Sequence, residues 1–267
     1  MVFLDPLFAI ISPTFYRRVA TQVWWRSLLY LAYLSLLVSL AFTAALKIHG
    51  GPRIDATFEW LKKSVPPMTF VNGKITSAMT APLTLRHPDL QQIAVAIDTN
   101  RVEPVTLQAL EETKVQAFLS SNALYFQDRP GHLNVYNFST AADPKPVTID
   151  AAFFESARQI FERVLYPAVF AAGILFNMLW LGGWTLIFAL VGLLLNALAE
   201  GGAPFRALIS IALYAQTLSA LLQGLTFLAG ITVPKWTLIS LLLTGTYIWL
   251  AIAKLRQPPA GEAPTAA

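Results

Sequence analysis

Few side chains in this sequence could carry acid–base, nucleophilic or metal chemistry. The chain has no cysteine, which excludes disulfides, thiolate metal ligands and cysteine nucleophiles. Its histidines, His49, His87 and His132, are too far apart to form an HxxxH pair, so a metal site would have to assemble across the fold. We expect these histidines to be exposed or to cap an element, and we predict no metal and no cofactor.

The acidic residues form no recognisable catalytic motif. Asp98 ends the alternating segment QQIAVAIDTN, where a carboxylate more often caps a strand than catalyses a reaction. Glu111 and Glu112 are expected on the solvated face of a short helix. The sequence contains no nucleophile elbow and no glycine-rich phosphate loop. We therefore predict no catalytic residue and a protein that is not an enzyme.

Polar side chains do occur inside the long apolar runs of the chain. They are amides and a phenol rather than charged groups: Asn177, Asn196, Tyr214, Gln216 and Gln223. One interpretation is interhelical hydrogen bonding, which contributes about 1–2 kcal/mol or less per contact in a membrane. The other is a groove that contacts a lipid or a partner protein. No charged residue lies in the middle of these runs, which argues against an ion-coupled transporter.

The apolar runs are the elements that must position these side chains. Hydrophobic residues make up 55% of the chain and charged residues only 13%, which is too little charge to cover a soluble surface of this size. Runs without Asp, Glu, Lys or Arg cover residues 27–46, 164–199, 207–234 and 236–253. Because a spanning helix needs about 20 apolar residues, we predict a mainly α-helical membrane protein with four transmembrane helices.

The run at residues 164–199 has two interpretations. As one helix it would be about 54 Å long against a hydrocarbon core of about 30 Å, so it would span the membrane and continue along the inner interface. Alternatively, the Gly-Gly pair at 182–183 could break it into a helical hairpin. A single span places Arg206, Lys254 and Arg256 in the cytoplasm, as the positive-inside rule requires, so we favour one helix.

The charge of the chain is arranged for a membrane and not for nucleic acid. Residues 47–163 carry twelve Lys or Arg and twelve Asp or Glu, so the net charge of +4 lies in the segments that flank the apolar runs. We therefore expect no nucleic-acid partner and both termini in the cytoplasm. Residues 1–26 are predicted to be an amphipathic interfacial segment, and the Pro/Ala-rich residues 254–267 a disordered tail.

Residues 47–163 are predicted to form an extracytoplasmic α+β domain. The segment PRIDATFEWLKKSV favours a helix, and Asn72-Gly73 between β-forming residues predicts a hairpin. Further strands, taken as antiparallel, follow before a helix that begins near VTIDAAFF with Thr148 or Asp150 as its cap. The predicted fold is therefore a four-helix transmembrane block, covering residues 27–46 and 164–253, with an inserted α+β domain.

Three segments carry a family resemblance: SPTFYRRVATQVWWRSLLYL, PPMTFVNGKITS followed by IAVAIDT, and FRALISIALYAQTLSALLQGL. Together they resemble the DUF1189 family of bacterial integral membrane proteins over most of residues 7–253. Where that family often has Pro-Pro, this chain has Gln216-Thr217-Leu218, so the proline that would kink the helix is missing. The resemblance implies a bacterial inner-membrane protein of unknown function, near the Yip1-type membrane proteins, with some members linked to maltodextrin use.

These features favour a non-enzymatic accessory, scaffold or sensor protein that acts through its extracytoplasmic domain. Its expected partners are membrane lipids and either other membrane proteins or further copies of the chain. The alternative is a transporter or permease subunit, with carbohydrate as a candidate cargo. A channel that touches Asn177 and Gln216 would favour the transporter, whereas a packed helical block with an exposed apolar face would favour the accessory role.

Overall fold

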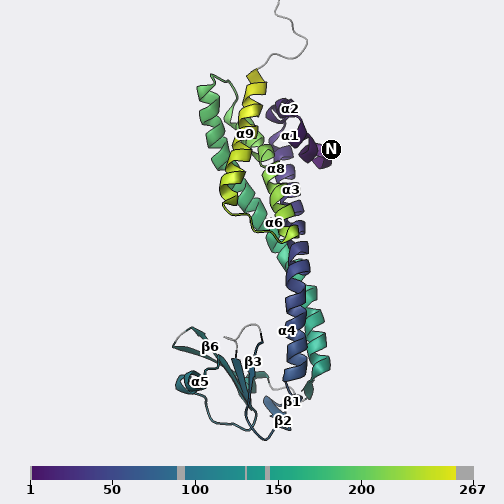
Figure 1. Ribbon diagram of the computed structural model, residues 1–267, viewed down its shortest axis with the longest axis vertical. Coiled ribbons are helices and arrows are strands. Elements are labelled where there is room, and N and C mark those ends of the chain that lie inside the picture. Colours follow the sequence, from purple (N-terminus) through teal and green to yellow (C-terminus); the bar gives the residue numbers. More distant parts are fainter. Residues whose placement is uncertain (1, 89–93, 130, 142–144, 257–267) are drawn as a thin grey trace, which may run out of the picture. The chain divides into compact units, whose positions relative to one another are not determined.

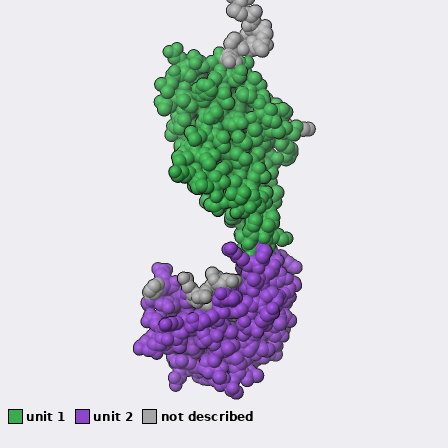
Figure 2. Space-filling view, viewed as in Figure 1, with its two compact units in different colours: residues 1–50, 165–267 green, residues 51–164 purple. Residues whose placement is uncertain are grey.

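The structure is a computed structural model that describes residues 2–88, 94–129, 131–141 and 145–256. The chain divides into two compact units, one made of Met1–Gly50 with Leu165–Ala267 and the other of Gly51–Val164 (Figure 2). Each unit has its own buried core. Residues 91–93 of the predicted strand and 257–267 of the predicted tail lie outside the described residues.

Four helices of the described chain are long and apolar enough to cross a membrane, which confirms the predicted number. They are Trp24–Ser64, Ala151–Leu198, Phe205–Ala229 and Trp236–Arg256. The first joins α3 (Trp24–Ala45), a π-helical segment (Leu46–Gly50) and α4 (Gly51–Ser64). The third joins α7 (Phe205–Ala215) and α8 (Thr217–Ala229), and the second and fourth are α6 (Ala151–Leu198) and α9 (Trp236–Arg256) (Figure 1).

The α6 helix is continuous across the whole apolar run at residues 164–199. It passes through Gly182 and Gly183 without a break, and its Pro167 also lies inside the helix. The single-helix interpretation is therefore confirmed, and the helical hairpin does not form. Neither glycine has a left-handed backbone angle, so nothing in the local backbone turns the chain there.

The α7 helix is the centre of the helical unit. Eight of its eleven residues are buried, among them Leu208, Ile211 and Tyr214. A helix with so many buried residues is enclosed by others, and α7 contacts α2, α3 and α9. The core of this unit also includes Tyr30 and Leu34 of α3 and Ile248 of α9.

Residues before α3 form a short 3₁₀ turn (Val2–Leu4) and two helices, α1 (Asp5–Ile11) and α2 (Phe15–Thr21), which lie against the helical unit beside α9 (Figure 1). The Tyr247 hydroxyl of α9 donates to the Ile10 carbonyl at 3.0 Å. Arg17 Nε donates to the Lys254 carbonyl at 3.0 Å. Large apolar side chains such as Phe3 remain exposed on this segment, so it presents both a packed face and an open apolar face.

The second unit contains two sheets, whose strands are β1 (Met68–Val71), β2 (Lys74–Ser77), β3 (Leu83–Arg86), β4 (Ala94–Asp98), β5 (Ala117–Ser120), β6 (Ala123–Arg129), β7 (His132–Asn137) and β8 (Val147–Ile149). One sheet has the order β2-β1-β8 and the other β3-β4-β5-β6-β7. All pairs are antiparallel except β4 with β5, so the prediction of antiparallel strands throughout is wrong for that pair. The helix α5 (Leu107–Thr113) supplies the crossover that a parallel pair requires.

The predicted hairpin is the β1–β2 pair. Asn72 and Gly73 both have positive φ, 48° and 72°, which is the type I′ geometry that matches the twist of two-residue hairpins. At the other end of the unit, Thr148 lies in β8, a strand that we did not predict. Asp150 is the cap of α6, because its Oδ1 accepts a hydrogen bond from the Phe153 N–H at 2.9 Å.

Candidate functional site

The third membrane-length helix is interrupted at Gln216, and side chains rather than a proline stabilise the interruption. The Gln216 N–H donates to the Leu213 carbonyl at 3.3 Å, whereas in a regular α-helix it would donate to the carbonyl of residue 212. Thr217 Oγ1 donates to the Tyr214 carbonyl at 2.6 Å, and Ser219 Oγ donates to the Gln216 carbonyl at 2.9 Å. The Gln216 carbonyl also accepts the Ala220 N–H at 2.9 Å, so the two hydroxyls add hydrogen bonds to carbonyls on either side of the interruption. The break therefore forms although the Pro-Pro pair is absent.

The interruption directs polar groups at two neighbouring helices. Gln216 Nε2 donates to Thr185 Oγ1 of α6 at 2.8 Å. The Tyr30 hydroxyl of α3 lies 2.6 Å from Thr217 Oγ1. All four side chains are buried, so each hydrogen bond replaces one that water cannot provide.

Tyr214 belongs to a buried group that includes the first helix of the chain. Its ring stacks on Tyr30 with centroids 3.8 Å apart, and its hydroxyl donates to Asp5 Oδ2 at 3.3 Å. The Asp5 carboxylate is only 3% exposed and also pairs with Arg26 Nη2 at 3.1 Å. A buried carboxylate needs such partners, so this contact fixes α1 against α3 and α7.

The two asparagines have local and interhelical roles. Asn177 Nδ2 donates to Ser39 Oγ of α3 at 3.0 Å and to the Gly173 carbonyl of α6 at 2.9 Å. Asn196 Nδ2 donates to the Gly201 carbonyl at 3.0 Å, which ties the end of α6 to the loop that follows it. Only Asn177 of this pair joins two membrane-length helices.

Gln223 lies where two cavities adjoin. A cavity of about 160 Å³ between α6, α8 and α9 is lined by Gln216 and Gln223, and one of about 430 Å³ between α3, α6 and α8 is lined by Asn177 and Gln223. Trp180 also lines both cavities. Asn177 and Gln216 thus face separate cavities that meet at Trp180 and Gln223.

The structure brings together polar residues that sequence inspection treated singly and adds some that it missed. Tyr214 and Gln216 belong to one cluster, whereas Asn177 and Asn196 lie elsewhere. The missed members are Asp5, Tyr30, Thr185 and Thr217. A carboxylate inside the apolar segment FLDPLFAII was the available signal for Asp5, because such a group needs a buried partner.

The histidines and Asp98 have structural partners. His49 Nε2 lies 3.0 Å from the Leu228 carbonyl, and His132 Nδ1 lies 2.7 Å from Asp128 Oδ1, a hydrogen bond that lowers the pKa of Asp128. His87 is buried, which corrects the expectation that all three would be exposed or capping. Asp98 Oδ1 accepts from the Asn100 N–H at 3.1 Å and so closes the turn after β4.

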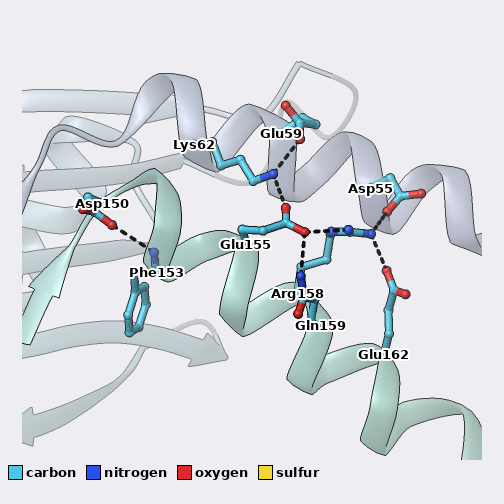
Figure 3. Close-up of polar contacts among 9 residues, drawn as sticks. All are labelled: Asp55, Glu59, Lys62, Asp150, Phe153, Glu155, Arg158, Gln159 and Glu162. Atoms are coloured by element: carbon cyan, nitrogen blue, oxygen red, sulfur yellow. Dashed lines mark hydrogen bonds and ion pairs between the residues drawn. The ribbon is translucent and has the colours of Figure 1, made fainter.

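An ion-pair network in the second unit joins α4 to the first turns of α6, ahead of the apolar run (Figure 3). Arg158 donates to Asp55 at 2.8 Å, Glu155 at 2.7 Å and Glu162 at 2.9 Å. Lys62 of α4 also donates to Glu155. Hydrogen bonds from Arg158 first, then Lys62, lower the pKa of Glu155 to about 2. Within the described residues no group of three or more His, Cys, Asp and Glu could hold a metal ion.

The arrangement defines a class of protein: a helical block with four membrane-length helices and an inserted two-sheet unit. Residues 6–252 match the family described as "Protein of unknown function (DUF1189)", so the chain belongs to that family. No curated protein and no solved structure matches the chain.

Proposed function

We propose that the protein is a non-enzymatic accessory, scaffold or sensor protein of the bacterial inner membrane, with both termini in the cytoplasm and the sheet unit outside. The observation that supports this role is the use of the polar residues in the helical unit. Gln216, Tyr214 and Asn177 each hydrogen-bond to a side chain on another helix. These residues then hold the helices of the block together, and partners would bind to the surface of the protein.

The edge of the five-stranded sheet is the candidate contact surface. Among the described residues β7 pairs with no strand other than β6, so it is an edge strand of this sheet. Val135 and Tyr136 on this strand are more than half exposed. An open edge with apolar side chains suits a protein partner that adds an extended segment.

Crosslinking and pull-down from native membranes test the accessory role. We expect a specific protein partner that Val135→Lys loses, because a charge on the edge strand opposes pairing. Val102→Lys is the matched control, since Val102 is also more than half exposed but lies in a loop. Recovery of no specific partner, or equal loss in both variants, would contradict the proposal.

The adjoining cavities favour a transporter or permease subunit as the second candidate. Gln216 lines one cavity and Asn177 the other, and Trp180 and Gln223 form the wall that the two cavities share. Uptake of labelled maltodextrin by proteoliposomes would support this role if Gln223→Leu abolishes it. Absence of uptake by the wild-type chain would count against that cargo.

A further inference from the structure

A lateral groove in the helical unit has a different chemical character from the two cavities around Gln223. It has a volume of about 420 Å³ and lies between α3, α6 and α7. Its walls are almost entirely apolar and include Leu28, Leu31, Leu186, Ile209 and Leu213. Because these helices are long and apolar enough to cross a membrane, such a groove would lie open to acyl chains.

One end of this groove carries a positive charge. Arg206 lines the groove, is exposed, and has no ion pair or side-chain hydrogen bond among the described residues. Trp24, which also lines the groove, is the first residue of α3, as Arg206 is the second of α7. Neither helix start has a side-chain cap, so the positive ends of both helix dipoles add to the charge of Arg206.

We propose that this groove binds one anionic phospholipid, with an acyl chain along the apolar walls and the phosphate at Arg206. The occupant follows from the distribution of charge: one cation at one end and an apolar surface beyond it match an amphiphile with a single anionic head. The tryptophan beside the cation is the residue type that favours the headgroup level. The inference rests on the proposed membrane location but on neither the accessory nor the transporter role.

Gly182 and Gly183 provide a matched pair of variants. Gly182 lines the groove, and a Cβ there would meet Leu31 at 3.7 Å, an ordinary contact. Gly183 does not line the groove, and a Cβ there would meet nothing within 4 Å. Gly182→Leu therefore fills the groove, whereas Gly183→Leu makes the same chemical change beside it. Arg206→Gln removes the charge from an exposed position and leaves the packed core unchanged.

Native mass spectrometry of the purified full chain, titrated with phosphatidylglycerol or phosphatidylcholine of equal chain length, measures the binding. We expect one saturable site that prefers phosphatidylglycerol by about fivefold, a preference that Arg206→Gln removes. Gly182→Leu should weaken the binding of both lipids roughly tenfold, and Gly183→Leu should bind them as wild type does. If Gly182→Leu does not fold, the loss of preference in Arg206→Gln still decides the question.

Three results would overturn the proposal. Equal binding of the two lipids by the wild-type chain would remove the role of charge. Equal binding by the two glycine variants would place the lipid elsewhere. Retention of a second copy of the chain in place of lipid would make the groove a dimer interface. Failure of the partner pull-down would leave each of these lipid measurements intact, so the two proposals fail separately.

Discussion

Gly73 combines a left-handed backbone conformation with a close approach of another segment. Its φ is +72°, and a Cβ there would lie 2.8 Å from the Phe138 carbonyl oxygen. Gly131 has a similar φ of +82° but open space around it. We predict that Gly73→Ala destabilises the sheet unit by roughly 1–2 kcal/mol more than Gly131→Ala, because both variants share the backbone strain and only one adds a clash.

Reversible unfolding followed by circular dichroism measures the difference between these glycine variants. Equal loss of stability in both would show that Phe138 moves aside without cost. Asn72-Gly73 predicted the hairpin from the sequence. The close approach of Phe138 could not be predicted, because Gly73 and Phe138 are 65 residues apart in the chain (138 minus 73).

The Asp5–Arg26 pair joins the first helix to the transmembrane-length α3. The Asp5 carboxylate is 3% exposed and the Arg26 side chain 27% exposed. We predict that Asp5→Asn or Arg26→Gln each destabilises the helical unit by roughly 1–3 kcal/mol, below the value for a fully buried pair because Arg26 reaches solvent. The double variant should lose less than the sum of the two, since each single change already breaks the pair.

A double-mutant cycle in mixed micelles checks this coupling. Glu200→Gln, at an exposed position after α6, is the control and should change stability by less than about 0.5 kcal/mol. Strict additivity of Asp5→Asn and Arg26→Gln would show that the pair contributes nothing.

At the scale of elements, the interruption between α7 and α8 is held by hydroxyl groups. Thr217 Oγ1 bonds both the Tyr214 carbonyl and the Tyr30 hydroxyl. Thr217→Val keeps the shape but leaves two buried polar groups without this partner, so we predict a loss of roughly 1–2 kcal/mol. Thr246→Val should have little effect, because the Thr246 hydroxyl donates to the Leu242 carbonyl on an exposed part of α9. A stability of Thr217→Val equal to that of Thr246→Val would exclude this role.

Sequence inspection predicted the membrane-length helices but not this interruption. Their hydropathy and length are local properties, and α6 and α9 follow from them directly. The interruption at Gln216 depends on side-chain hydrogen bonds. Gln216 bonds to Thr185 and Thr217 to Tyr30, and both partners lie on segments distant in the sequence. The parallel β4–β5 pair was missed for a similar reason, because strand direction depends on how α5 crosses the sheet.

The α4–α6 network predicts a pH dependence. The folded-state pKa of Glu155 is about 2, below its ordinary value of 4.5, so its contribution to stability is fully present above pH 4.5 and is lost as the pH falls toward 2. We therefore expect the α4 amides of wild type to be better protected from hydrogen exchange than those of Glu155→Gln at pH 6. As the pH falls through 2 this difference should shrink toward zero, because Glu155 then becomes protonated in the folded state as well.

Exchange rates corrected for the intrinsic effect of pH provide the comparison. Wild type and variant share every other acidic residue, so the difference between the two proteins reports the Glu155 carboxylate. Glu111→Gln on the exposed face of α5 is the control and should leave α4 unchanged at both pH values. A difference between wild type and Glu155→Gln that is as large at pH 2 as at pH 6 would mean that packing, not charge, accounts for it.

At the scale of the whole molecule, the number of membrane crossings decides where each surface acts. If all four membrane-length helices cross, as we propose, both ends of the chain lie on one side and residues 47–163 on the other. The proposed topology puts the ends in the cytoplasm, as the positive-inside rule favours, since Arg18 and Arg256 flank the helical block while the insert is neutral. The proposed partner surface on β7 and the proposed headgroup site at Arg206 would therefore face opposite compartments.

The absence of cysteine makes this topology directly testable, because single cysteines can be introduced without a background. Glu111→Cys, Arg18→Cys and Arg256→Cys all lie at exposed positions. In intact cells with a permeable outer envelope, a membrane-impermeant maleimide should label Glu111→Cys, whereas Arg18→Cys and Arg256→Cys should react only after the inner membrane is opened. Labelling of Arg256→Cys but not of Arg18→Cys in intact cells would require an odd number of crossings and would contradict the proposed topology.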